Sequence, residues 1–294
     1  MAIASSELIV NDDGSVFHLH LKPEEISRKI LLVGDPGRVA AVAAFLDEGS
    51  IEFRRASREF VSLTGKYHGD RITVLSTGIG CDNIDIVMNE LDALANIDFA
   101  TREIKKEKTS LEILRLGTSG AIQPGIPIGS YVFSHYSVGC DGLLNWYAAR
   151  EEITDVELEE EFMKQVGWSR HLPTPYFAKA SEEIERRFSS GVIKGCTVSA
   201  GGFYGPQGRV LRMPLAIENM LEKFEAFSYK GLKITNFEME GSAIAGISGH
   251  LGHKAGTICA IIASRYAGTS NPDYKENMVG DFIKFVLDSY CDTI

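Results

Sequence analysis

The sequence lacks long hydrophobic runs and any paired cysteine motif. No apolar run approaches the ~20 residues that a helix needs to cross a bilayer, and residues 1–13 have neither the basic start nor the apolar core of a signal peptide. We therefore expect a cytoplasmic protein without a membrane partner. The five cysteines are an odd number, widely spaced and without a CxxC pair, which disfavours both a disulfide framework and a zinc site.

Positive charge is also scarce, because 30 basic side chains stand against 40 acidic ones, for a formal net charge of −10. This balance disfavours nucleic acid as a partner, whereas a few arginines in a cleft can still bind a small anion. The 294 residues, 44% of them hydrophobic and 24% charged, are typical of a globular chain that buries a sizeable core. Since no repeat, low-complexity tract or linker interrupts the sequence, we expect a single domain over residues 1–294.

Short apolar runs bounded by glycine alternate with segments of helical period. The predicted strands are 29–33, 72–76, 111–116, 131–135, 192–199, 234–237 and 257–263, and the predicted helices are 38–45, 83–96, 216–228, 240–251 and 281–290. This alternation predicts an α/β fold, which we expect to be a single three-layer α/β/α domain with a central mixed β-sheet. The charged segment 145–191 is expected to form a helical insertion at the surface. In such folds, ligands bind at the carboxyl ends of the strands.

Glycine and arginine follow the first predicted strand. Gly34 lets the backbone approach an anion closely, and the helix that starts after it presents free N–H groups. Arg38 lies in the first helical turn, where its charge opposes the helix dipole unless an anion offsets it. The same strand–turn–helix is equally consistent with a plain connection and an exposed arginine, so this motif alone does not define a phosphate site.

A second arginine lies within an apolar strand. An unpaired guanidinium costs several kcal/mol to bury, so Arg115 requires either a carboxylate or a ligand anion. The hydroxyls of Thr118 and Ser119, just beyond it, are donors suited to phosphate oxygens. Arg58 is a third candidate, although its neighbour Glu59 is also consistent with a surface salt bridge.

Four motifs occur in an order that resembles a known family. They are Gly-Asp-Pro-x-Arg-Val at 34–39, Ser-Thr-Gly-Ile-Gly at 76–80, Arg-Leu-Gly-Thr-Ser-Gly-Ala-Ile-Gln at 115–123 and Asn-Phe-Glu-Met-Glu at 236–240. With these motifs the chain resembles the nucleoside phosphorylase-I family, the purine nucleoside and uridine phosphorylases. The resemblance covers nearly the whole chain and is weakest over 145–191. It implies a pentosyltransferase that splits a nucleoside with inorganic phosphate as co-substrate.

The resemblance implies a phosphate pocket built from Gly34, Arg38, Arg115 and Thr118. Arg58 is expected to reach into this pocket from a neighbouring subunit. The resemblance therefore implies a homo-oligomer, either a dimer or a trimer-of-dimers hexamer, in which the active sites are shared between subunits.

Some bacterial members of the family bind a monovalent cation at the dimer interface. Their ligands stand at the positions of Glu59, Ile79 and a serine, and this chain has Asn83 at the serine position. The cation therefore stays an open expectation. The chemistry implied by the resemblance requires no other cofactor and no metal in the active site.

The ribose site is implied by the Glu-Met-Glu motif and by an N-terminal histidine. Considered alone, Glu238 and Glu240 are also consistent with acidic residues at a helix start. By resemblance, Glu240 holds the ribose 2′ and 3′ hydroxyls, Met239 lies under the sugar, and Glu238 is nearby with a less direct role. His18 matches a histidine of the uridine branch that contacts the ribose 5′ hydroxyl across a subunit boundary, whereas His20 does not match.

The loop at 202–209 carries the residues expected to recognise the base. Glutamine offers one acceptor and two donors, and arginine offers donors only. Gln207 and Arg209 can therefore satisfy the two carbonyls and the N–H group of uracil, and Phe203 can stack on the ring. The alternative is a polar, glycine-rich loop without such a role. The pattern Phe-Tyr-x-x-Gln-x-Arg resembles the uracil-recognition loop of the uridine branch.

The residue type at position 265 distinguishes the uridine branch from the purine branch. Purine phosphorylases and related nucleosidases carry an aspartate here, which protonates the purine leaving group. With arginine instead, a purine would lack its general acid, whereas fixed donors can stabilise a uracil anion. Ile262, on the preceding strand, is expected to line the base. We therefore expect uridine as the substrate, in pyrimidine salvage, with deoxyuridine and thymidine left open.

The expected catalytic residues are Arg38, Arg115, Gln207 and Arg209, which act by positioning and electrostatics. Three alternatives remain: a purine nucleoside phosphorylase, a nucleosidase of the same fold that uses water, and a non-catalytic nucleoside-binding protein. A Rossmann dehydrogenase is disfavoured, because no GxGxxG fingerprint follows the first strand.

Overall fold

The computed structural model describes residues 2–291. Its strands are β1 (Lys29–Val33), β2 (Phe53–Ser57), β3 (Phe60–Tyr67), β4 (Asp70–Ser76), β5 (Ile97–Asp98), β6 (Glu103–Ile104), β7 (Glu112–Ala121), β8 (Tyr131–Gly139), β9 (Tyr176–Lys179), β10 (Ile193–Ser199), β11 (Ser228–Tyr229), β12 (Leu232–Glu238), β13 (Lys254–Ser264) and β14 (Thr269–Ser270). Its α-helices are α1 (Pro36–Ala43), α2 (Cys81–Asn96), α3 (Val156–Val166), α4 (Glu182–Arg187), α5 (Met220–Ala226), α6 (Gly241–Leu251), α7 (Tyr274–Asn277) and α8 (Val279–Tyr290).

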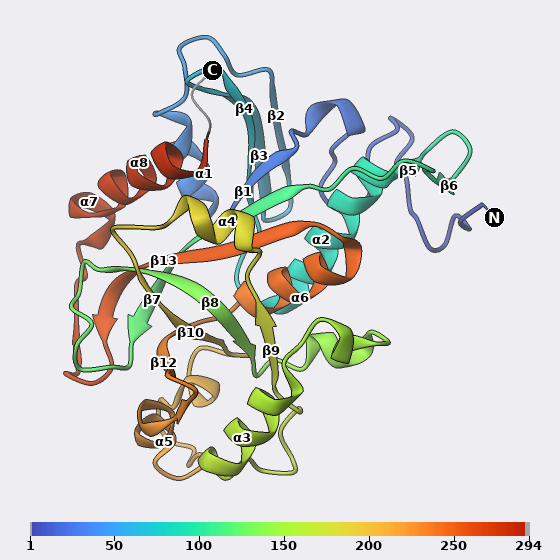
Figure 1. The fold of residues 1–294 in the computed structure, drawn as a ribbon. Coiled ribbons are helices and arrows are strands. Elements are labelled where there is room, and N and C mark those ends of the chain that lie inside the picture. Colours follow the sequence, from blue (N-terminus) through green and yellow to red (C-terminus); the bar gives the residue numbers. More distant parts are fainter. Residues whose placement is uncertain (1, 292–294) are drawn as a thin grey trace.

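The strands form one large mixed sheet (Figure 1). Its order is β11-β12-β10-β8-β13-β7-β1-β4-β3-β2, with β9 paired to β8 and β14 paired to β13. Strand β1 is parallel to both β4 and β7, and every one of its residues is buried. A strand covered on both faces is typically a continuous apolar run, which is why its sequence, Lys-Ile-Leu-Leu-Val, was recognisable. The predicted α/β fold with a central mixed sheet is confirmed.

An additional pairing closes part of the sheet on itself. The end of β12 runs antiparallel to the end of β7, with Phe237 opposite Gly120. Because β7, β13, β8, β10 and β12 are already neighbours in that order, this pairing joins them into a five-stranded barrel. The closure brings the carboxyl end of β12 against the carboxyl end of β7, although the two strands lie far apart in the sequence.

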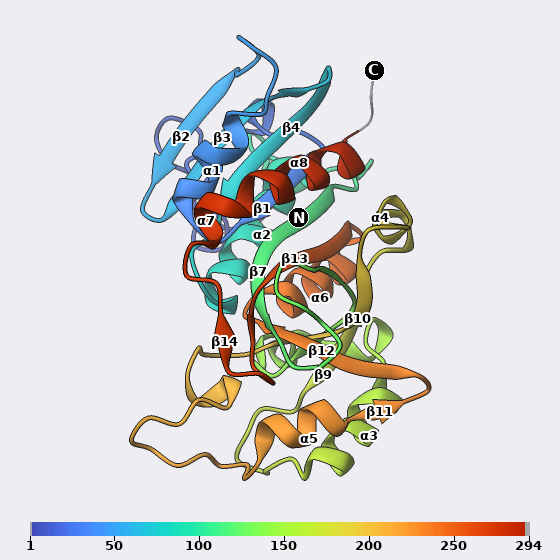
Figure 2. The ribbon, with the colours of Figure 1, turned by 90° about the vertical axis from the view of Figure 1, so that its left-hand side faces the viewer.

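Helices cover both faces of the sheet (Figures 1 and 2). One hydrophobic cluster joins α1, α4 and α8 to the strands, and a second joins α2 and α6 to the opposite face. These clusters are the outer layers of the three-layer arrangement. A third cluster packs α3 and α5 against the barrel strands β10 and β12.

The segment 145–191, predicted to be helical, contains the helices α3 and α4. It also contains β9, which pairs antiparallel with β8 and which the sequence reading did not predict. Phe162 of α3 and Phe177 of β9 are fully buried together. The segment therefore contributes to the sheet and to the core as well as to the surface.

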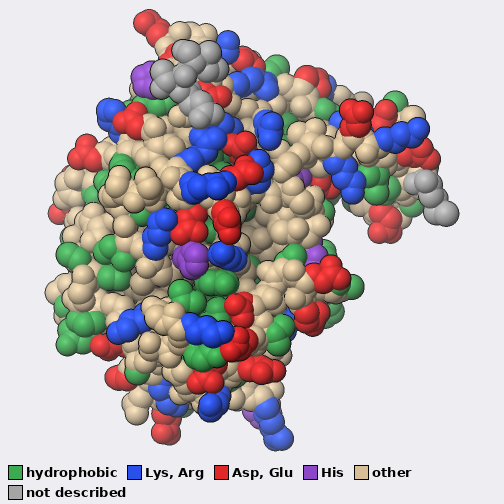
Figure 3. Space-filling view, viewed as in Figure 1, with side chains coloured by type: hydrophobic (Ala, Val, Ile, Leu, Met, Phe, Trp, Pro, Cys, Tyr) green, Lys and Arg blue, Asp and Glu red, His purple; other side chains and the backbone are tan. Residues whose placement is uncertain are grey.

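Charged side chains of both signs are interspersed on the face shown in Figure 3. Within residues 2–291, no helix combines the length and the apolar character needed to cross a membrane. Cys81, Cys140, Cys196 and Cys259 are free thiols.

Candidate active site

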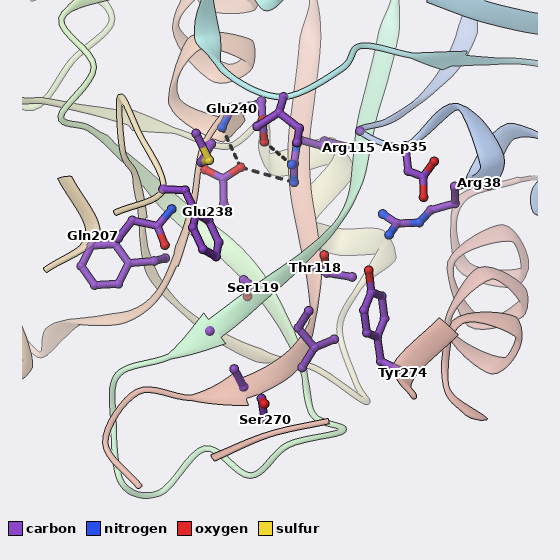
Figure 4. Close-up of a pocket in the computed structure, with 18 of the residues that line it drawn as sticks. Asp35, Arg38, Arg115, Thr118, Ser119, Gln207, Glu238, Glu240, Ser270 and Tyr274 are labelled. Atoms are coloured by element: carbon purple, nitrogen blue, oxygen red, sulfur yellow. Dashed lines mark hydrogen bonds and ion pairs between the residues drawn. The ribbon is translucent and has the colours of Figure 1, made fainter. Parts of the chain in front are cut away.

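A cavity of about 770 Å³ opens where the rim of the barrel meets the end of β1 (Figure 4). It collects every predicted site residue except His18 and Arg58. The predicted residues that line it are Gly34, Arg38, Arg115, Thr118, Phe203, Gln207, Arg209, Glu238, Met239, Glu240 and Ile262. Five separate segments of the chain therefore converge on one site.

Arg38 enters the cavity from the first turn of α1. That helix begins at Pro36, and the side chain of Asp35 caps it by accepting from the backbone N–H of Gly37 at 2.8 Å. The guanidinium is buried, and among residues 2–291 its hydrogen-bond acceptor is the carbonyl of Leu116, at 3.3 Å. Burial lowers its pKa, and the nearby charge of Arg115 lowers it further. Within residues 2–291 no carboxylate pairs with Arg38, so an anion in the cavity would supply the missing counter-charge.

Arg115 projects from β7 and is paired with two carboxylates. Its Nη1 lies 3.3 Å from Glu238 Oε2, and its Nη2 donates to Glu240. Burial alone would lower the pKa of this guanidinium, but the two carboxylates outweigh it and raise the pKa. The buried Nε has no hydrogen-bond partner in the described part of the chain. The structure thus answers the question left open by the sequence, because carboxylates hold Arg115.

A glycine next to Arg115 shapes this part of the site. A Cβ on Gly117 would lie 1.9 Å from Nη1 of Arg115 and 2.9 Å from Sγ of Cys259. The glycine therefore makes room for the guanidinium. Beyond it, the hydroxyl of Ser119 accepts from Asn236 at 2.9 Å, whereas Thr118 lines the cavity wall.

Glu238 lines the cavity, and its carboxylate also caps the start of α6. Its carboxylate accepts from the backbone N–H of Glu240 at 2.9 Å, from that of Gly241, and from the hydroxyl of Ser199. These bonds satisfy the free N–H groups at the start of α6. Together with its ion pair to Arg115, they fix both Arg115 and Glu240 in place.

Glu240, like Glu238, is buried and lines the cavity. It accepts from the backbone N–H of Gly80 at 2.6 Å and from Arg115. Burial raises the pKa of its carboxyl, and the charge of Arg115 opposes that rise. Met239 lies beside it on the cavity wall.

The base loop forms a connected cluster around Gln207. Arg209 Nη1 donates to Gln207 Oε1 at 2.7 Å, and its guanidinium carbon lies 3.8 Å from the ring centroid of Phe203. Arg265 Nη1 donates to the backbone carbonyl of Gln207 at 3.0 Å. Burial lowers the pKa of Arg209 to about 10, and the charge of Arg265 contributes, so Arg209 stays protonated at neutral pH. This end of the cavity is rich in donors.

His18 and Arg58 lie together outside the cavity. Phe17 links them, since its ring packs edge-on against His18 at 4.8 Å and lies 6.0 Å from the guanidinium carbon of Arg58. Arg58 is exposed, in the turn between β2 and β3, with a φ of 53°. Neither residue lines the cavity of its own chain.

One wall of the cavity was not predicted from the sequence. Ser270, Asn271, Pro272 and Tyr274 approach from the segment between β14 and α7, and Figure 4 shows Tyr274 between Arg38 and Thr118. The polar turn Asn-Pro-Asp after a buried strand was the available signal. The local sequence pattern does not predict that this turn lies close to Arg38, which is far away in the sequence.

The residues expected at an interface cation gather around Gly78. A Cβ there would lie 2.7 Å from Nδ2 of Asn83 and 3.3 Å from Cγ of Glu59. Among residues 2–291, no three His, Cys, Asp or Glu side chains cluster as metal ligands. The cation at this position stays a prediction.

Residues 28–286 match the model of the phosphorylase superfamily, and the chain belongs to that family. It is 31% identical to a uridine phosphorylase of Thermococcus kodakarensis over 265 residues, which cover 89% of this chain and 82% of the relative. It is 30% identical to a uridine phosphorylase of Haemophilus influenzae over 259 residues, covering 85% and 86% of the two chains. Its fold matches a Trypanosoma brucei nucleoside phosphorylase described as showing uridine phosphorylase activity, with a TM-score of 0.87, 29% identity and coverage of 96% and 99%. The predicted family is confirmed.

Proposed function

We propose that this protein catalyses the reversible phosphorolysis of uridine to uracil and ribose 1-phosphate, in pyrimidine salvage. One observation carries the proposal: a single cavity joins Arg38, at the end that we assign to the anion, to Gln207, at the donor-rich end, with Glu240 between them (Figure 4). The relatives of similar length support it, since two are named uridine phosphorylases.

At the anion-binding end, Arg38 supplies the counter-charge for inorganic phosphate, and Arg115, whose charge is paired with two carboxylates, supplies a hydrogen-bond donor. In the described part of the chain, Arg38 has no carboxylate partner and the Arg115 Nε has no hydrogen-bond acceptor. Charge-assisted hydrogen bonds to phosphate are about twice as strong as neutral ones. Thr118 adds a hydroxyl on the same wall. These residues hold the nucleophile and reduce its repulsion of the leaving group.

In the middle of the cavity, Glu240 binds the ribose. Its ion pair with Arg115 favours the carboxylate form, which accepts from the 2′ and 3′ hydroxyls. Met239 packs below the sugar. The sugar C1′ then lies between the phosphate and the base.

At the donor-rich end, Gln207 and Arg209 bind uracil, with Phe203 and Ile262 beside the ring. A phosphate oxygen bonds to C1′ as the C1′–N1 bond breaks, and the electron pair of that bond passes to N1. The negative charge spreads over O2 and O4 of uracil, where positioned donors stabilise it. Uracil takes up a proton from solvent on release.

The rival functions fit the base cluster less well. A purine phosphorylase needs an acid for its leaving group, whereas Arg265 supplies a second cation next to Arg209. A nucleosidase that uses water has no need for two arginines at one anion position. A binding protein without activity would not require donors aligned with a developing charge.

The assembly belongs to the same proposal. His18 and Arg58 form one surface patch outside their own cavity, which is the arrangement expected if both serve the site of a neighbouring subunit. We infer a homo-oligomer, a dimer or a hexamer built from dimers, with shared active sites. The cytoplasmic location stays a prediction.

The test is a cleavage assay over uridine, thymidine, cytidine and inosine, with and without inorganic phosphate. Phosphate-dependent release of uracil, faster than release of hypoxanthine, is the expected result. Preferential cleavage of inosine would contradict the assignment of the base.

A further inference from the structure

Glu90 binds the segment that carries His18. It lies on α2, and its Oε1 accepts from the backbone N–H of His18 at 3.0 Å while its Oε2 accepts from that of Leu19 at 2.9 Å. The same Oε1 lies 2.6 Å from Nδ1 of the His18 ring. One carboxylate thus holds two consecutive backbone groups and the imidazole.

This contact orients the imidazole. A carboxylate only accepts hydrogen bonds, so the short contact places a hydrogen on Nδ1. In the neutral ring Nε2 is then an acceptor. No residue among 2–291 hydrogen-bonds Nε2, and 29% of the His18 side chain is exposed, so this acceptor is presented on the surface beside Phe17 and Arg58.

We propose that Glu90 is a positioning residue, which fixes His18 as an Nε2 acceptor for the 5′ hydroxyl of the ribose bound by a neighbouring subunit. This inference rests on the proposed phosphorolysis of uridine. The carboxylate itself does not touch the substrate. Its effect is to select nucleosides that carry a 5′ hydroxyl, since a pre-oriented partner loses less entropy when the bond forms.

Glu90→Gln tests the orientation with little change in shape. Only an oxygen at the Oε2 position can accept from both backbone N–H groups, which lie 3.2 Å (His18) and 2.9 Å (Leu19) from it. In that orientation the NH₂ group takes the Oε1 position and faces Nδ1 of His18. Nδ1 becomes the acceptor, and the ring hydrogen moves to Nε2. Nitrogen NMR of histidine-labelled protein at about pH 8, well above the ordinary histidine pKa, reports this tautomer, with His18→Ala identifying the signal.

The expected spectrum has hydrogen on Nδ1 in the unmodified protein and on Nε2 in Glu90→Gln. Hydrogen on Nε2 of the unmodified protein, or no difference between the two proteins, would overturn the proposal. Because this readout needs no turnover, it is independent of the proposed function. If the tautomer inverts as expected but uridine is not cleaved, the assigned reaction fails and the orienting contact stands.

Kinetics test the effect on the substrate. Glu90→Ala is expected to lower kcat/KM for uridine about ten-fold, the usual effect of one lost hydrogen bond, and to leave that for 5′-deoxyuridine within about two-fold. In the double variant His18→Ala/Glu90→Ala the loss should not exceed that of His18→Ala alone, because the two residues act through one contact. An equal loss on both substrates would mean that Glu90 only supports the fold, and would refute the proposal.

His20→Asn is the matched control. His20 is exposed in the same segment with a φ of 51°, and asparagine tolerates that backbone conformation. Its ratio of uridine to 5′-deoxyuridine activity should equal that of the unmodified protein. A changed ratio would assign the selectivity to the segment as a whole rather than to Glu90, against the proposal.

Discussion

Replacing Arg38 with methionine should improve folding stability while it weakens phosphate binding. The guanidinium is buried, burial and Arg115 both lower its pKa, and no carboxylate in the described chain pairs with it. Such a charge destabilises the empty site, partly offset by water in the open cavity. Methionine fills a similar volume without charge. We expect the free energy of unfolding of the phosphate-free protein to rise by about 1 kcal/mol, and Tm by about 2 °C.

With phosphate present, the unmodified protein should become more stable than the Arg38→Met variant. Saturating phosphate at about 100 times Kd stabilises the unmodified protein by about 2.7 kcal/mol. Loss of the charged donor costs about 2–4 kcal/mol of binding, or about 30- to 1,000-fold in kcat/KM for phosphate. The same phosphate concentration should therefore stabilise the Arg38→Met variant by less than about 1 kcal/mol, so that its Tm rises much less than that of the unmodified protein.

Thermal melts with and without phosphate measure the change in stability, and kinetics at varied phosphate concentration measure the change in phosphate binding. Arg186→Met is the matched control, since Arg186 is exposed on α4 and does not line the cavity. It should keep the phosphate-induced rise in Tm. An Arg38→Met variant that is less stable without phosphate, or that is still stabilised by phosphate to the full extent, would refute the reasoning.

Three further predictions concern the shared site, the packing and the thiols. Co-expressed Arg38→Ala and Arg58→Ala subunits should regain about a quarter of the full activity, because hybrids are about half of randomly paired dimers and one of the two sites in each hybrid is intact. Gly139→Ala should lower the free energy of unfolding by about 2–4 kcal/mol, since its Cβ would lie 2.1 Å from Cζ of the buried Tyr176. Burial raises the pKa of Cys259 to about 12, so alkylation of the native protein at about pH 8 should spare it, as mass spectrometry can measure.

Each of these has a control. For the shared site, the control is a mixture of Arg38→Ala subunits with Arg115→Ala subunits. Both residues belong to the cavity of their own subunit, so no site in a hybrid dimer is intact and no activity should return. Activity in this control mixture, or no activity in the mixture of Arg38→Ala with Arg58→Ala, would contradict shared sites. Gly125→Ala adds a Cβ with no atom within 4 Å and should leave the denaturation midpoint unchanged. Rapid labelling of Cys259 in native protein, as fast as in denaturant, would contradict its burial.

The sequence pattern predicted the helices and strands that are determined by their own residues. The bounds of β1 agree with the predicted run 29–33 because its residues are all buried between two helical layers. Helix α5 is shorter than the predicted 216–228 because Asn219, with a φ of 52°, precedes its first turn. Strand β2 was missed because its three central residues are exposed, and two of them, Arg54 and Arg55, break the apolar pattern.

Long-range pairing could not be predicted in this way. Strand β7 continues past the predicted 111–116 through a run of small and polar residues to Ala121, because β12 and β13 pair with that end. The same closure brings Glu238 to Arg115. The sequence indicated that Arg115 needs an anion, but only the barrel shows which carboxylates lie next to it.

Product analysis of a single reaction tests the central proposal most directly. Uridine and inorganic phosphate are incubated with the protein, and uracil, ribose 1-phosphate and free ribose are quantified together. We expect one ribose 1-phosphate for each uracil, and no uracil when phosphate is left out. Uracil released with free ribose in the absence of phosphate, or no cleavage of uridine at all, would contradict it.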